Sequence, residues 1–365
     1  TIIHPDGCQI QQEIIVPENE EENENCPVTS QEIILPEGWF LFSTFMAPTE
    51  KSEYNIAELM EPIVDNITIV KDDNGSVYWP MFGLNSIGNI LNGRGYQIKM
   101  STIDTLIAEG IMIDSSYPIE LAAGWSFLGY LHSSSFDVSD MMSPINNDLY
   151  LMKDYSGAIY WPMLNINSIG NMNPGWGYQV KMDANVTFNY PNNENGRIGN
   201  LENKFISKYF NKPVNTGNNM VVGIPNNAWL NQPQEGDEIV VYDSSGLLVG
   251  NAPYLTTGSV ITIWGDDETT LEKDGLHVGE KMTLQLFRNL NQSIEELNVS
   301  RWEEGSEKYI LDGISIAGAI NTNSNMDKKL IKVVDLLGRD VNTNSQNLTL
   351  IYIYDNGTIE KKLRQ

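Results

Sequence analysis

Cysteine is scarce in this chain of 365 residues, and the only two copies, Cys8 and Cys26, lie in its N-terminal stretch. A chain of this length can bury a sizeable core without disulfides or metals. An even pair of cysteines in a short segment flanked by prolines predicts one disulfide between Cys8 and Cys26, provided that the chain is exported. Two free thiols on a flexible arm are the alternative.

Basic residues are also few, since 22 Lys and Arg stand against 48 Asp and Glu and give a formal net charge of −26. Binding to phosphate groups needs clustered Lys and Arg, so this composition argues against nucleic acid as a partner. An anionic membrane surface is disfavoured for the same reason. Solubility and attraction for cations such as calcium are the expected consequences.

Sequence signatures of catalysis and of membrane insertion are missing. The three histidines stand in no metal-binding spacing such as HExxH, and no GxSxG, GxxxxGKS/T or GxGxxG motif occurs. No run of 18 apolar residues is present, so we expect no membrane-spanning helix. We predict that the protein is not an enzyme and spans no membrane.

A duplication dominates what the sequence does contain. The segment YWPMFGLNSIGN (Tyr78–Asn89) returns 82 residues later as YWPMLNINSIGN (Tyr160–Asn171), with nine of twelve positions identical. Each copy opens with Gly-Trp, continues with a short stretch of helical apolar spacing and a hairpin, and closes with a GYQ-K strand. Asn74-Gly75 and Ser156-Gly157 supply the turn residues of the hairpins. We therefore predict two small α+β repeats, over residues 35–117 and 118–195.

The rest of the chain divides into four segments. Residues 1–34 form an arm whose run ENEEENEN is acidic, and whose short apolar EII runs could each add a strand to a neighbouring sheet. A connector at 196–218 leads to seven short β-like runs over 219–320, which predict an antiparallel β-sandwich. Residues 321–365 form a small β module. The predicted fold class is mainly β and multidomain, with two tandem α+β repeats followed by sandwich modules.

Two groups of residues are candidates for ligand contact. Asp266, Asp267, Glu268 and Asp274 crowd one long loop, and oxygen ligands on an irregular loop suit calcium. A solvated acidic loop with a turn at Asp274-Gly275 is the alternative, and no other cofactor is expected. Trp176 is the one tryptophan of the repeats whose counterpart is an arginine, Arg94. This substitution favours an exposed aromatic contact at Trp176.

The C-terminal stretch resembles the sorting domain of cargo proteins of the type IX secretion system of Bacteroidetes. The resemblance rests on VVDLLGRDV (Val333–Val341) and LIYIYDNGTIEKK (Leu350–Lys362). The matching residues are Asp335, Leu336, Leu337, Gly338, Arg339, Gly357, Lys361 and Lys362. The repeats are similar to tandem modules of large secreted proteins of that group. The resemblance implies export through the secretion machinery, by way of the C-terminal domain, to the outer cell surface or the medium.

These observations predict a non-catalytic secreted or cell-surface protein with a structural or adhesive role. Tandem copies of one unit extend a molecule and can meet copies of themselves. An edge strand can also accept a strand from a neighbouring chain, and the arm is the expected donor. We therefore expect self-association into a filament or surface layer. The alternative is a carbohydrate-binding accessory module of a larger secreted adhesin or enzyme, with Trp176 as a contact residue and a polysaccharide as the partner.

Overall fold

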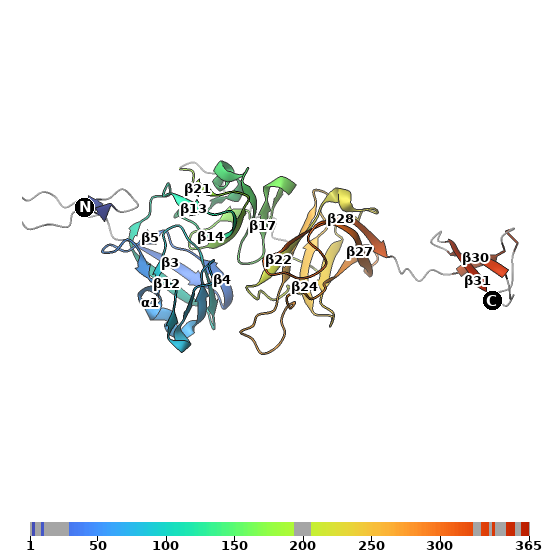
Figure 1. The fold of residues 1–365 in the computed structure, drawn as a ribbon, viewed down its shortest axis with the longest axis horizontal. Coiled ribbons are helices and arrows are strands. Elements are labelled where there is room, and N and C mark those ends of the chain that lie inside the picture. The colour runs from blue at the N-terminus through green and yellow to red at the C-terminus, as the bar shows by residue number, and fades with distance from the viewer. Residues whose placement is uncertain are drawn as a thin grey trace, which may run out of the picture.

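The computed structural model describes residues 2–3, 9–10, 29–192, 206–323, 330–335, 338–339, 348–354 and 359–364. Most of its elements are strands in antiparallel sheets, with a few short helices (Figure 1), which confirms the predicted mainly β fold. The predicted disulfide between Cys8 and Cys26 lies outside the described residues. Among the described residues, every helix is too short or too polar to cross a membrane.

The two predicted repeats share one architecture. Repeat 1 contains a five-stranded sheet in the order β4-β11-β7-β8-β9, and repeat 2 contains one in the order β14-β20-β16-β17-β18. The strands of the first sheet are β4 (Gly38–Phe42), β7 (Ile67–Lys71), β8 (Val77–Trp79), β9 (Leu84–Asn85) and β11 (Tyr96–Met100). Those of the second are β14 (Gly124–Gly129), β16 (Leu149–Lys153), β17 (Ile159–Trp161), β18 (Ile166–Asn167) and β20 (Gly177–Met182).

Short elements complete each repeat in the same way. The helical stripe predicted from the sequence forms one turn of α-helix that continues as a 3-10 helix at a proline. In repeat 1 these elements are β6 (Tyr54–Asn55), α1 (Ile56–Met60), η1 (Glu61–Asn66), η2 (Pro80–Phe82) and β10 (Asn89–Ile90). In repeat 2 they are β15 (Phe136–Asp137), α2 (Val138–Met141), η3 (Ser143–Ile145), η4 (Pro162–Leu164) and β19 (Asn171–Met172).

The tyrosine of the duplicated dodecapeptide has the same environment in both copies. Tyr78 pairs with Asn85 and Tyr160 pairs with Asn167, and both tyrosines are buried in the common core of the repeats. Because side chains alternate along a strand, the tryptophan that follows each tyrosine lies on the opposite, outer face of the sheet. Duplication of one folding unit therefore accounts for the repeated segment.

The arm does not end where the sequence suggested. β3 (Thr29–Leu35) pairs along its full length with β12 (Asp104–Met112), and β5 (Met46–Ala47) pairs with the end of β12. The corresponding pair in repeat 2 is β13 (Ile119–Leu121) with β21 (Val186–Phe188). The apolar EIIL run is thus a strand of repeat 1 and is already paired within this chain. Residues 2–3 and 9–10 form the two short paired strands β1 (Ile2–Ile3) and β2 (Gln9–Ile10).

The two repeats join through equivalent backbone contacts. The Ser43 amide donates to the Gly175 carbonyl at 3.0 Å, and the Gly129 amide donates to the Gly93 carbonyl at 2.8 Å. A Cβ atom on Gly177 would lie 2.9 Å from the carbonyl oxygen of Phe42. The glycines around the GYQ-K strands therefore let the two backbones approach closely, and one core runs through both repeats.

All seven β-like runs of the sandwich form strands. Their order is β24-β23-β26-β27-β28-β22-β25, and every neighbouring pair is antiparallel except β22 with β28. The edge strands β24 and β25 lie against each other, so the sheet curls around its own core. The elements are β22 (Asn219–Ile224), η6 (Asn226–Ala228), β23 (Glu238–Tyr242), β24 (Leu248–Pro253), β25 (Ser259–Trp264), β26 (Thr283–Arg288), β27 (Ser293–Glu304) and β28 (Ile314–Asn323).

The C-terminal module is a three-stranded antiparallel sheet in the order β29-β30-β31. Its strands are β29 (Leu330–Val334), β30 (Leu348–Tyr354) and β31 (Ile359–Arg364). Its all-β character agrees with the prediction for this segment.

Candidate functional site at the junction of the repeats and the sandwich

Each repeat carries the same group of four polar or aromatic side chains on the outer face of its sheet. In repeat 1, Gln97 on the central strand β11 pairs with Lys71 on β7 and with Leu41 on β4. Lys99, also on β11, pairs with Trp39 on β4. Alternation along the strands places these side chains on one face. We call Trp39, Lys71, Gln97 and Lys99 the repeat 1 cluster. The repeat 2 cluster, at equivalent positions, is Trp125, Lys153, Gln179 and Lys181.

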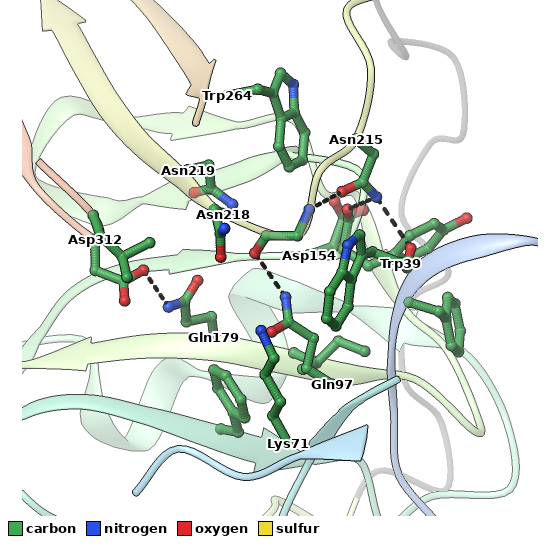
Figure 2. Close-up of a pocket in the computed structure, with 16 residues that line it drawn as sticks. Trp39, Lys71, Gln97, Asp154, Gln179, Asn215, Asn218, Asn219, Trp264 and Asp312 are labelled. Carbon is green, nitrogen blue, oxygen red and sulfur yellow. Dashed lines mark hydrogen bonds between the residues drawn. The ribbon is translucent and has the colours of Figure 1, made fainter. Parts of the chain in front are cut away.

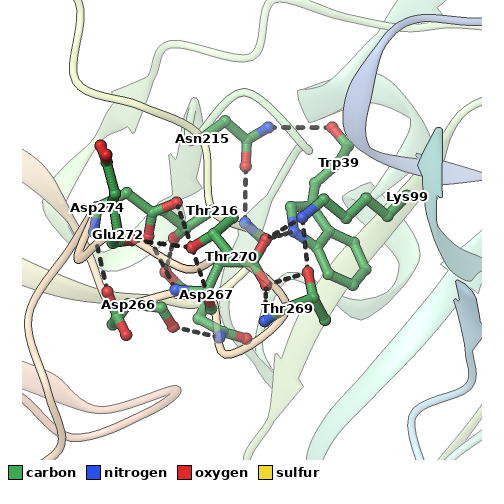
Figure 3. A network of polar contacts seen from close by, with 12 residues as sticks. Trp39, Lys99, Asn215, Thr216, Asp266, Asp267, Thr269, Thr270, Glu272 and Asp274 are labelled. Atoms are coloured by element: carbon green, nitrogen blue, oxygen red, sulfur yellow. Dashed lines mark hydrogen bonds and ion pairs between the residues drawn. The ribbon is translucent and has the colours of Figure 1, made fainter. Parts of the chain in front are cut away.

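The repeat 1 cluster binds a carboxylate of the sandwich, that of Asp267. The indole Nε1 of Trp39 donates to Asp267 Oδ2 at 2.6 Å, and Lys99 Nζ lies 2.7 Å from the same oxygen (Figure 3). Burial raises the pKa of Asp267, but the hydrogen bonds from Lys99 and Trp39 outweigh it and hold the pKa below its ordinary value. Charge-assisted hydrogen bonds of this kind are stronger than neutral ones.

The repeat 2 cluster binds a second aspartate of the sandwich, Asp312. Gln179 Nε2 donates to Asp312 Oδ1 at 2.6 Å, and Trp125 Nε1 donates to the Asp312 carbonyl at 2.9 Å. Lys153 Nζ lies 2.7 Å from Asn219 Oδ1 and 3.5 Å from Asp312 Oδ1. Burial lowers the pKa of Lys153 to about 8, against the opposing effect of Asp312. Both clusters therefore attach a repeat to the sandwich.

Cation–π contacts hold the lysines of each cluster over its tryptophan. Lys71 Nζ lies 4.5 Å from the centre of the Trp39 ring, and Lys153 Nζ lies 4.3 Å from that of Trp125. An ammonium group within about 6 Å of an indole ring is attracted by its π electrons. The similar spacing in the two copies indicates that this arrangement belongs to the duplicated unit.

A cavity of about 160 Å³ lies where the two repeats meet the sandwich. Its walls combine aromatic rings with amide and charged side chains. Figure 2 shows the Lys71 side chain running beside Gln97 toward Asn218, at the end of the connector, and Asn219, at the start of the sandwich. Gln97 Nε2 donates to the Gly217 carbonyl at 2.7 Å. Repeat 1, repeat 2 and the sandwich all contribute to the lining.

The four acids of the predicted calcium site have different roles. Asp267 binds repeat 1, while Asp266 Oδ1 accepts from the Asp274 amide and Asp274 Oδ1 accepts from the Asp267 amide, each at 2.9 Å (Figure 3). Glu268 is exposed. Within the described residues, no group of three or more His, Cys, Asp or Glu side chains is placed to hold a metal. The loop is instead organised by hydrogen bonds and by its contact with repeat 1.

Trp176 is only partly exposed, although the arginine at the equivalent position of repeat 1 had suggested an exposed side chain. Its ring packs edge-on against Tyr155 at 5.0 Å and Phe40 at 6.0 Å, and it borders the core of the repeats. Its counterpart Arg94 lies at the equivalent contact, where Nη2 donates to the Glu120 carbonyl at 2.8 Å. The two positions differ because each side chain fills a different partner surface on the opposite repeat.

The sorting-type motif forms a compact turn where the structure describes it. The Arg339 amide and Nε donate to the two carboxylate oxygens of Asp335 at 3.0 and 2.8 Å, and Gly338 has a φ of 80°. Lys361 lies exposed on β31, and Lys362 belongs to the same strand. Leu336, Leu337 and Gly357 lie outside the described residues.

The sequence interpretation missed the two clusters as functional groups. The recurring KD before the hairpin turn and the recurring GYQ-K strand contain three of the four members, and Gly-Trp contains the fourth. Their recurrence was a signal that could have been used. The residues of the sandwich that they bind could not be inferred, because those residues carry no repeat pattern of their own.

Comparison with known proteins gives no relative on which a function could rest. No protein-family model matches the chain, and no curated protein matches it.

Proposed function

We propose that this protein is a non-catalytic structural or adhesive protein of the cell surface or the medium, and that it self-associates. The proposal rests on the finding that residues present in both repeats make the contacts between modules. Both clusters bind aspartates of the sandwich, Asp267 and Asp312, and the glycines of the closing strands join one repeat to the other. Such a repeated unit serves through its shape and its surfaces.

An apolar patch on repeat 1 supports self-association. It consists of Trp79, Met81, Phe82 and Leu84, where Met81 is 84 % exposed, Phe82 59 % and Leu84 51 %. The Trp79 ring is partly buried and packs edge-on against Phe82 at 4.8 Å. Contiguous exposed apolar groups of this kind mark interaction sites.

Part of the equivalent surface of repeat 2 is covered by another module of the same chain. Trp161 is fully buried and Ile166 is 7 % exposed, because both pack against the sandwich. The contacting residues on β22 and β28 include Val221 and Ile314. In repeat 2 this duplicated surface binds a β module, the sandwich. We therefore expect the partner of the repeat 1 surface to be a β module as well.

We take a second copy of this chain as the partner of the patch. The patch shares the outer face of the repeat 1 sheet with the Trp39–Asp267 contact, so a second molecule would extend an existing interface. The pairing of the EIIL run within repeat 1 leaves the patch, instead of that part of the arm, as the candidate contact. A contact between unlike surfaces of successive copies would build a filament, and one between like surfaces would build a dimer.

Sedimentation velocity of the full chain tests this proposal. We expect species heavier than the monomer mass of 40.9 kDa, with a weight-average mass that rises with concentration. Phe82→Ser should return the protein to monomer, because it removes the most exposed ring of the patch. Met163→Ser is the matched control, since Met163 is the counterpart of Met81 and is 69 % exposed on repeat 2, in the part of the equivalent surface that the sandwich leaves open. Identical association of Phe82→Ser and the unmodified protein would refute the role of the patch.

Location and export follow from the resemblance of the C-terminal module and belong to the same proposal. The Asp335–Arg339 turn is a feature that secretion machinery could recognise. Replacement of Asp335 by Ala, which removes both carboxylate acceptors of the turn, should reduce secretion in a host that has this machinery. Undiminished secretion of that variant would count against the assignment.

The carbohydrate-binding alternative stays a prediction, but without Trp176 as its contact residue. That ring is partly buried and packs edge-on against Tyr155 and Phe40, so less of it is open to a sugar than an exposed position would offer. A glycan array with the full chain would test the alternative.

A further inference from the structure

Lys71 stands out among the lysines of the two clusters. It lines the cavity at the junction, and among the described residues its Nζ has no hydrogen-bond acceptor or ion-pair partner within bonding distance. Burial lowers its pKa, while Asp267 and Glu268 oppose this effect from a longer range. Removing an ammonium group partly from water without an acceptor is unfavourable. An acceptor at this point would therefore be stabilised.

The other copy of the repeat shows which acceptor the arrangement takes. Lys153, the counterpart of Lys71, and Gln179, the counterpart of Gln97, both lie within 3.5 Å of one carboxylate oxygen, Asp312 Oδ1. In repeat 1, Asp267 is bound by Trp39 and Lys99 at the other side of the cluster. Lys71 and Gln97 are left facing the cavity without a carboxylate.

We propose that this cavity binds a small organic carboxylate, with Lys71 as the residue that recognises its charge. The aromatic residues Trp39, Phe127, Tyr155 and Trp264 line the same cavity and suit an apolar body. A volume of about 160 Å³ is close to the roughly 150 Å³ that accommodates benzene in a protein interior. The ligand class is accordingly an aromatic or short aliphatic acid.

The acids that line the cavity are already bound within the chain. Asp154 Oδ1 accepts from the amides of Ser156 and Ala158 in the hairpin turn, at 2.8 and 2.9 Å. Asp312 accepts from Gln179 and pairs with Lys153. Lys71 is thus the cation of the cavity that a carboxylate would meet. This site is independent of the apolar patch, so each proposal can fail without the other.

Titration calorimetry with benzoate tests the site, with benzamide as a neutral ligand of the same shape. We expect benzoate to bind the unmodified protein and benzamide to bind at least about tenfold more weakly, because it lacks the charge that Lys71 recognises. Equal binding of the two ligands, or binding of neither, would overturn the proposal. This comparison requires no variant.

A pair of variants locates the site. Lys71→Met should weaken benzoate binding by about ten- to a hundredfold, the usual effect of losing a hydrogen bond to a charged group. Lys181→Met is the matched control, because Lys181 also lies over a tryptophan of its cluster, at 5.9 Å from the Trp125 ring, but does not line the cavity. Benzoate binding that survives Lys71→Met, or that is lost equally in both variants, would exclude Lys71 as the recognition residue.

Discussion

The twin tryptophans of the repeated segment should differ sharply in their contribution to stability. Trp161 is fully buried between repeat 2 and the sandwich, whereas Trp79, at the equivalent position, is only partly buried. Replacing each by alanine removes the same side chain from the same Tyr-Trp-Pro context. Trp161→Ala should be strongly destabilising, and Trp79→Ala should have little effect on the monomer.

The magnitude follows from burial. Removing a buried tryptophan costs about 3–5 kcal/mol in transfer and cavity terms. The Trp161 Nε1 has no hydrogen-bond partner among the described residues, and losing such a buried donor recovers about 1 kcal/mol or more. We therefore expect a net loss of about 3 kcal/mol for Trp161→Ala. For the partly exposed Trp79 we expect a loss of about 1 kcal/mol or less.

Differential scanning calorimetry of both variants measures this difference. For modules of this size, 1 kcal/mol lowers the transition temperature by about 2–4 °C, so Trp161→Ala should lower it by about 6–12 °C. The protein should be dilute, because association through the patch would add stability that Trp79→Ala removes. Equal shifts for the two variants would show that the sandwich does not bury Trp161 more than Trp79.

Three further predictions concern the junction. Gly223→Ala should destabilise the contact by about 1–3 kcal/mol, because its Cβ would lie 3.2 Å from Trp161 Cζ3; an unchanged transition temperature would contradict this contact. Lys153 has a pKa of about 8 when folded and 10.5 as its ordinary value, so the unfolded state binds more protons between these pH values. The free energy of unfolding of the unmodified protein, relative to Lys153→Met, should therefore rise by up to about 3 kcal/mol from pH 8 to 10.5, and a flat difference in urea unfolding would refute it. Because Asp267 is bound to Trp39 and Lys99, we expect the transition temperature to be the same in calcium and in chelator, and a clear rise with calcium would instead support the predicted calcium site.

Local features of the fold were predictable because short-range chemistry determines them. The hairpin turns form where Asn74-Gly75 and Ser156-Gly157 indicated, and both Gly75 and Gly157 have a φ of 85°. The seven strands of the sandwich also follow from their short β-like runs and the turn residues between them. Such signals lie within a few residues of the element that they produce.

Contacts between modules were not predictable from a single sequence. Trp39 binds Asp267 across 228 residues of chain. The sequence near either residue contains no pattern that identifies the other as its partner. The exposure of Trp176 was overestimated because an arginine, Arg94, stands at the equivalent position of repeat 1. Both side chains lie at the contact between the repeats, where an arginine does not indicate exposure to solvent. The strand β3 was assigned to the arm because its partner β12 lies about seventy residues further on.

If the repeats join molecules as well as modules, the mass of the protein in solution depends on its concentration. Sedimentation equilibrium at concentrations from about 1 µM to 1 mM covers the range of weak to moderate association. We expect a weight-average mass that rises above 40.9 kDa with concentration for the unmodified protein and that stays at this value for Phe82→Ser. A mass of 40.9 kDa for the unmodified protein over the whole range would contradict it.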